Sequence, residues 1–201
     1  SVTDRCDLRC VYCMPEAGVP LVAMAEMLTY EEIAAVARAA MAAGVRRFRL
    51  TGGEPLARRG IAALVRLLAG LGPDDLALTT NGLHLADVAA DLKAAGLARV
   101  TVSLDTLRAD RFEKITRRKG LDRIFAGIHA ARAAGLAPLK VNTVVIRGVN
   151  DDEIPDFVRF AEREGIELRF IELMPTSGLS PECKELGAWR PSLFVKGEEV
   201  R

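Results

Sequence analysis

The sequence predicts an α/β fold in which strands and helices alternate along the chain. Segments rich in apolar and β-branched residues are each followed by a segment with helical periodicity, and glycines separate the units. This order implies parallel strands joined by right-handed crossovers. An open doubly wound sheet and a curved partial barrel are both compatible with it. A complete eight-stranded barrel usually needs about 250 residues, so six strand–helix units fit a chain of 201 residues better.

A strand-like segment opens each unit. We expect residues 1–4 to be the end of a first strand, and later strands to cover residues 45–51, 76–80, 100–104, 139–146 and 166–173. One domain should span residues 1–175. Residues 176–201 contain prolines and glycines but no sustained period, so we expect an irregular C-terminal tail there, of unknown role.

The helices are predicted from capping residues at their starts, from apolar residues at helical spacing that form a stripe along one face, and from glycines at their ends. Thr29 and Glu32 form a capping box, and Gly44 ends the stripe that follows it. Asn150 or Asp151 is expected to cap the last helix. The apolar stripes consist of Ile33, Val36, Ala37, Ala40 and Met41; Ile61, Leu64, Val65 and Leu68; Leu85, Val88, Ala89 and Leu92; Ile124, Phe125 and Ile128; and Ile154, Phe157, Val158 and Ala161. Since ligands of such folds bind at the carboxyl ends of the strands, the residues after each strand are the candidates for a site.

Composition excludes several classes of protein. Half of the residues are hydrophobic and the mean hydropathy is +0.15, which argues against a disordered chain. Lys and Arg number 28 and Asp and Glu 27, so the net charge of +1 gives no reason to expect nucleic acid or an anionic membrane as a partner. No apolar run approaches about 18 residues and no secretory signal opens the chain. We therefore expect a cytoplasmic protein.

The cysteines are unevenly placed. Cys6, Cys10 and Cys13 lie within eight residues, whereas Cys183 stands alone. Clustered thiols indicate a reduced metal site rather than a disulfide framework. Structural zinc and [4Fe–4S] clusters usually take four protein ligands, so three cysteines would leave one iron of a cluster open for a substrate or cofactor. A zinc site completed by another residue, and three small buried side chains, are the alternatives.

A C-x3-C-x2-C loop with Tyr12 before its third cysteine, together with Gly52-Gly53-Glu54-Pro55 after a strand, resembles the radical S-adenosylmethionine (SAM) enzymes. The resemblance implies a partial (βα)6 TIM-like barrel. It also implies one [4Fe–4S] cluster, ligated by three cysteines, whose open iron chelates SAM. Reductive cleavage of SAM then gives a 5′-deoxyadenosyl radical that abstracts a hydrogen atom from the substrate.

Further motifs are similar to one subfamily, the GTP 3′,8-cyclases, which perform the first step of molybdenum cofactor biosynthesis. They are residues 1–6, Cys13-Met14-Pro15, residues 49–56, residues 79–82, Val102-Ser103-Leu104-Asp105, Lys140-Val141-Asn142 and residues 170–175. The similarity implies that Cys6, Cys10 and Cys13 hold the cluster, that Tyr12, Gly53, Ser103 and Met174 contact SAM, and that Arg49, Thr80 and Lys140 face GTP. No side chain is expected to serve as an acid, base or nucleophile in the first step.

The residues themselves leave other roles open. The Arg49 guanidinium suits a phosphate or a purine edge. Lys140 lies in an apolar strand and needs a partner, for which a phosphate would serve, although a lysine that reaches the rim is an equal alternative. Ser103 and Thr80 could be ordinary strand hydroxyls, and Met174 a core residue. No P-loop occurs, so GTP would rely on scattered strand-end residues.

The chain also departs from the cyclase pattern. Cyclases hold a second cluster with three cysteines near the C-terminus, and here only Cys183 follows residue 175, so we expect a barrel without its substrate-closing region. A radical SAM enzyme for another small molecule, an inactive barrel that binds only cluster and SAM, and a zinc-binding module are the alternatives. An electron donor such as flavodoxin or ferredoxin is expected as a partner, and the sequence leaves a homodimer open.

Overall fold

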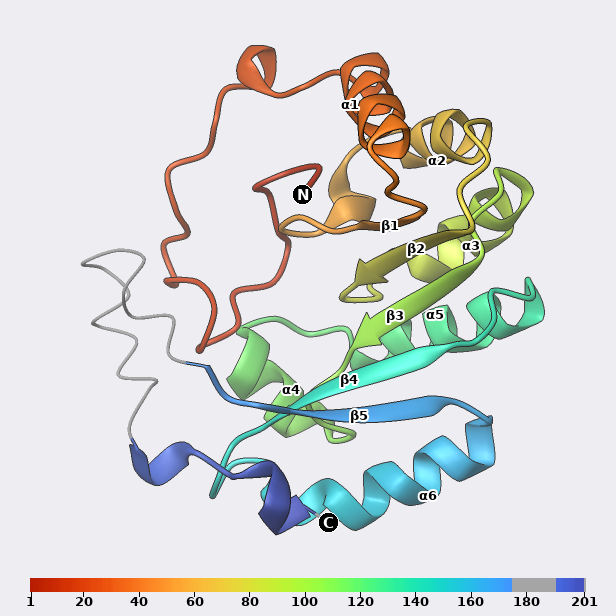
Figure 1. Cartoon of the computed structure of the whole chain (residues 1–201). Coiled ribbons are helices and arrows are strands. Elements are labelled where there is room, and N and C mark those ends of the chain that lie inside the picture. Colours follow the sequence, from red (N-terminus) through yellow and green to blue (C-terminus); the bar gives the residue numbers. More distant parts are fainter. Residues whose placement is uncertain (175–190, 201) are drawn as a thin grey trace. The chain divides into compact units, whose positions relative to one another are not determined.

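The computed structural model describes residues 1–174 and 191–200 (Figure 1). Their contacts divide the chain into two compact units. Unit 1 contains Ser1–Asp7, Leu21–Val102 and Asp122–Leu139, and unit 2 contains Leu8–Pro20, Ser103–Leu121 and the described residues from Lys140 onward. The tail boundary predicted at residue 175, like Cys183, lies outside the described residues.

Unit 1 is built on three parallel strands, β1 (Arg47–Leu50), β2 (Asp75–Thr80) and β3 (Arg99–Ser103, whose last residue belongs to unit 2). Leu50 pairs with Leu78, and Leu78 with Val100, so apolar residues align across the sheet. Helix α1 (Tyr30–Ala42) contacts α2 (Ile61–Ala69), which contacts α3 (Leu85–Ala94) (Figure 1). Helix α5 (Leu121–Ala133) and the 3-10 helices η1 (Met24–Glu26) and η2 (Pro55–Ala57) complete the unit.

The predicted periodicity places most of the core of unit 1 correctly, although Val36 of the α1 stripe is 60% exposed and the unpredicted Ala34 is buried. The predicted stripes of α2, α3 and α5 supply Leu64, Val65, Leu85, Leu92 and Ile124, all almost fully buried. The capping box at Thr29 is also confirmed, because the Thr29 hydroxyl accepts from the Glu32 amide at 3.1 Å and the Glu32 carboxylate accepts from the Thr29 amide at 2.7 Å.

Unit 2 pairs β4 (Lys140–Val145) with β5 (Glu167–Glu172) in parallel. It also contains α4 (Ala109–Thr116), the 3-10 helix η3 (Asp151–Glu153) and α6 (Ile154–Glu164). After the gap, η5 (Pro191–Leu193) and η6 (Gly197–Val200) return to the same strands. Ile146 bridges Phe194 in antiparallel fashion, and the Gly197 amide donates to the Glu172 carboxylate at 2.8 Å.

Three predictions about elements need correction. The described residues contain five strands rather than six, because residues 1–4 make only isolated bonds, such as Val2 N to Thr51 O at 2.7 Å, and no regular ladder. Helix α4 was not predicted, since its eight residues give too short a stripe. The predicted cap of the last helix is also wrong. Helix α6 begins at Ile154, and the 3-10 turn η3 lies between it and Asn150, whose side chain makes no capping bond. None of the described helices is long and apolar enough to cross a membrane.

Candidate functional site

The cysteine loop is divided between the two units. Cys6 belongs to unit 1, whereas Cys10 and Cys13 belong to unit 2. Within unit 2, the amides of Cys13 and Met14 donate to the Cys10 carbonyl at 2.9 and 3.0 Å. Cys6 and Cys10 are half-buried and Cys13 is exposed. Among the described residues, no group of three or more His, Cys, Asp or Glu side chains is arranged to hold a metal ion. The chemistry of the donors fits an iron–sulfur cluster, because reduced cysteine thiolates are its usual ligands. The ligand set therefore stays a prediction from spacing.

The C-terminal end of α4 holds the backbone of this loop. The last carbonyls of a helix have no partner within it. Here the amides of Arg9 and Val11 donate to the carbonyls of Thr116 and Ile115, both at 2.9 Å. Arg117, which follows the helix in the left-handed conformation with φ 55°, donates to the Arg9 carbonyl at 3.2 Å. The loop thus completes the helix end, and the helix end fixes the loop.

A side-chain hydrogen bond fixes Tyr12, the residue directly before Cys13. The Tyr12 hydroxyl donates to Oδ2 of Asp105 at 2.5 Å, and Oδ1 of Asp105 accepts from the Val144 amide at 2.9 Å. Burial raises the pKa of Asp105 to about 6, although both hydrogen bonds act in the opposite direction. Burial and the nearby Asp105 charge raise the pKa of Tyr12, so the phenol stays a donor. Asp105 was not predicted as a site residue.

The glycine turn after β1 is a place of close backbone approach. A Cβ atom on Gly53 would lie 2.3 Å from the Arg5 carbonyl oxygen, and one on Gly52 would lie 2.7 Å from the Thr3 carbonyl oxygen. The Gly53 amide donates to the Thr3 carbonyl at 2.7 Å. No side chain fits at either position. The two glycines therefore bring the turn against the segment that leads into Cys6.

Glu54 joins this turn to the end of β2. Its carboxylate is almost completely buried and accepts from the Thr80 hydroxyl at 2.7 Å, from the Asn81 amide at 2.6 Å and from the Leu56 amide at 2.8 Å. Burial raises the pKa of Glu54, and these three hydrogen bonds oppose the rise. The Asn81 side chain in turn donates to Oδ1 of Asp7 at 2.5 Å. The motif at residues 79–82 does not predict this connection.

The three residues predicted to face GTP differ in their surroundings. Arg49 lies exposed on β1, and its Nη1 donates to the hydroxyls of Thr79 at 2.9 Å and Thr101 at 3.0 Å. Thr80 is buried and bonded to Glu54. Lys140 is the first residue of β4 and forms an ion pair with Glu167, the first residue of β5. The partner that a lysine in an apolar strand requires is thus a carboxylate of the neighbouring strand.

The other residues predicted to contact SAM occupy strand ends of unit 2. Ser103 is the half-buried last residue of β3, and Met174 lies two residues beyond β5 with 71% of its surface exposed. A core position for Met174 is therefore excluded. The SAM contacts of Tyr12, Gly53, Ser103 and Met174 stay predictions from the resemblance.

Comparison with known proteins defines the class. A family profile described as the Radical SAM superfamily matches residues 1–161, and the chain belongs to this superfamily. Enzymes of this superfamily use a [4Fe–4S] cluster and SAM. Solved structures support the fold at low sequence identity. Methylornithine synthase has a TM-score of 0.74 at 17% identity and matches 99% of this chain and 58% of its own. Streptococcus suis SuiB, solved with bound SAM, has a TM-score of 0.75 at 20% identity and matches 88% of this chain and 40% of its own.

Two relatives with higher sequence identity to this chain are both named GTP 3′,8-cyclase. GTP 3′,8-cyclase of Moorella thermoacetica is 54% identical over 202 residues, which are all of this chain and 62% of the relative. GTP 3′,8-cyclase of Geobacter sulfurreducens is 53% identical over 201 residues, 59% of its own length. The chain thus spans about six-tenths of the curated relatives that it matches.

Proposed function

We propose that this chain is the radical SAM portion of a GTP 3′,8-cyclase, which acts in molybdenum cofactor biosynthesis. The observation that carries the proposal is the C-x3-C-x2-C spacing of Cys6, Cys10 and Cys13 in a chain about half identical to proteins of that name. When held by Cys6, Cys10 and Cys13, the cluster would supply, together with SAM, the radical chemistry for joining C3′ of GTP to C8 of its guanine.

The residues of the chain would bind and orient the reactants. Cys6, Cys10 and Cys13 would ligate the cluster. Tyr12 would meet SAM through its ring or backbone, because its hydroxyl already donates to Asp105. Gly53, which accepts no side chain, would let SAM approach the backbone of the turn. Ser103 and Met174 would complete the SAM contacts.

On the GTP side, Arg49 is the residue that the structure supports best, because it is exposed and its guanidinium suits a phosphate or a purine edge. Lys140 would have to exchange Glu167 for a phosphate, and Thr80 would have to give up Glu54. An electron donor such as flavodoxin or ferredoxin would reduce the cluster. The clustered thiols favour a reducing compartment, so we place the protein in the cytoplasm.

The test uses the chain reconstituted anaerobically with iron and sulfide, reduced, and supplied with SAM and GTP deuterated at C3′. We expect 5′-deoxyadenosine that carries deuterium, together with cyclised GTP. Replacement of a ligand, Cys10→Ala, should abolish both, whereas Cys183→Ala should change neither. Unlabelled 5′-deoxyadenosine without cyclised GTP would refute cyclase function and leave radical SAM chemistry. Bound zinc without iron would refute both.

A further inference from the structure

We propose that Asp105 is a positioning residue that fixes the Cys10–Cys13 loop through Tyr12. The inference rests on the proposed cluster ligation and adds a residue to it. Asp105 would not touch the cluster or SAM. Its role would be to hold Tyr12, one of the two residues between Cys10 and Cys13.

The first support is the geometry of the pair. Both residues belong to unit 2, and the Tyr12 hydroxyl reaches Oδ2 of Asp105 at 2.5 Å across 93 residues of sequence. Asp105 retains only 8% of its surface exposed. A charge-assisted hydrogen bond in a site protected from water is stronger than a neutral one on the surface. The Tyr12 side chain is thus fixed to the residue that follows β3 and Leu104.

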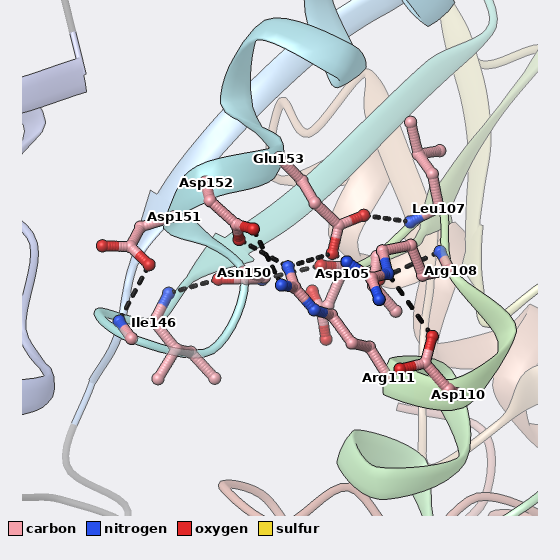
Figure 2. A network of polar contacts seen from close by, with 12 residues as sticks. Asp105, Leu107, Arg108, Asp110, Arg111, Ile146, Asn150, Asp151, Asp152 and Glu153 are labelled. Atoms are coloured by element: carbon pink, nitrogen blue, oxygen red, sulfur yellow. Dashed lines mark hydrogen bonds and ion pairs between the residues drawn. The ribbon is translucent and has the colours of Figure 1, made fainter.

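The second support is that Asp105 is itself held on two sides. Its Oδ1 accepts from the Val144 amide at 2.9 Å, and its carbonyl accepts from the Asn150 side chain at 2.6 Å. Asn150 also accepts from the Ile146 amide at 2.7 Å, which joins it to the end of β4 (Figure 2). The carboxylate that receives Tyr12 is therefore immobilised by the backbone of the neighbouring strand.

The third support is the buried Glu153, which fixes the residues directly after Asp105. Its carboxylate accepts from the Thr106 hydroxyl at 2.7 Å and from the Leu107 amide at 2.8 Å (Figure 2). Arg111 of α4 donates to the same carboxylate at 2.8 Å. Helix α4 is the helix whose last carbonyls hold Arg9 and Val11. One polar network therefore supports both attachments of the cysteine loop, by backbone at α4 and by side chain at Asp105.

A cluster site needs such support, because its ligands must be held within narrow limits by groups that do not themselves bind the metal. Residues 10–13 lie in a turn outside any helix or strand. The end of α4 and Arg117 hold this segment only through the backbone of Arg9, Val11 and Met14. Without Tyr12 anchored, residues 10–13 would therefore lose their side-chain restraint.

The experiment measures loss of the cluster from the reconstituted, anaerobic chain to an iron chelator, together with the electron paramagnetic resonance spectrum of the reduced cluster with and without SAM. Tyr12→Phe and Asp105→Ala should each accelerate cluster loss about tenfold and change the spectrum. Their combination should be no worse than either alone, because both remove one interaction. Asp105→Asn should restore much of the retention, since the Tyr12 hydroxyl can accept from the amide.

The chain offers a matched control. Tyr30 is its other tyrosine, and the Tyr30 hydroxyl also donates a hydrogen bond, to the Arg59 carbonyl at 2.8 Å. Tyr30→Phe should leave cluster retention and spectrum unchanged. If Asp105→Ala fails to fold, Tyr12→Phe and Asp105→Asn carry the comparison.

Two outcomes would overturn the inference. Wild-type retention and spectrum in Tyr12→Phe would show that the hydroxyl does not restrain the loop. Additive effects of Tyr12→Phe and Asp105→Ala would show that Asp105 does not act through Tyr12. Failure of the proposed function is a separate result, in which the unmodified chain itself binds no iron.

Discussion

Glu54→Gln tests whether the buried carboxylate after the glycine turn is a structural link. In the wild type, Oε1 accepts from the Leu56 amide and the Thr80 hydroxyl, and Oε2 accepts from the Asn81 amide. Glutamine keeps one oxygen and replaces the other with a donor. In either orientation of the amide, one backbone N–H, that of Asn81 or that of Leu56, faces another donor.

The magnitude follows from that single unsatisfied group. A buried donor without its acceptor costs about 1–3 kcal/mol. For a chain of this size, about 2 kcal/mol lowers the unfolding midpoint by about 4–8 °C. Urea unfolding of the metal-free chain should therefore show a lower midpoint at an unchanged slope. Glu26→Gln, at an exposed glutamate, should stay within about 0.5 kcal/mol of wild type. Equal midpoints for the two variants would refute the link.

Three further predictions follow from the same unit. The pKa of Glu54 is raised in the folded chain, so the stability that this group contributes is present below its unfolded pKa and is lost as pH rises through its folded pKa. The difference in unfolding free energy between wild type and Glu54→Gln, measured in urea titrations, should therefore narrow from pH 4 to pH 7. A difference that widens over this range would contradict the sign. Gly53→Ala places a Cβ atom 2.3 Å from the Arg5 carbonyl oxygen and should lower the unfolding free energy by about 1–3 kcal/mol, whereas Gly70→Ala, with φ −62° and its nearest neighbour at 3.4 Å, should not destabilise the chain in thermal unfolding. Thr29→Ala removes the capping bond of α1 and should cost about 1 kcal/mol in the same measurement, and an unchanged midpoint would show that the cap does not contribute.

Local signals were sufficient for much of the fold. The capping box at Thr29, the apolar stripes and the glycine turn depend on neighbours in sequence, so their periods and spacings predict them. Residues 1–4 failed as a strand because ladder formation depends on the register with a distant segment, which composition does not encode. Helix α4 was missed because a short helix has few periodic positions.

The residues of the candidate site stay predictions from sequence motifs, and the residues that support them were not predicted. Cys10, Gly53 and Arg49 stand in motifs of recognisable spacing. The acceptors that organise their surroundings, Asp105 and Glu54, are recognisable only once Tyr12 and Thr80 are known to reach them across 93 and 26 residues. The ion-pair partner of Lys140, Glu167, could likewise not be predicted, since the contact depends on the pairing of β4 with β5.

The fastening of Tyr12 to Asp105 imposes an order on the biogenesis of the protein. The thiols at positions 10 and 13 are synthesised before the carboxylate and the helix end that shape their loop, which follow about 100 residues later. Until translation has passed Arg117, the nascent loop has neither attachment. If Cys10 and Cys13 ligate the cluster as proposed, iron and sulfide would reach a correctly shaped loop only after residues 105–117 have been synthesised.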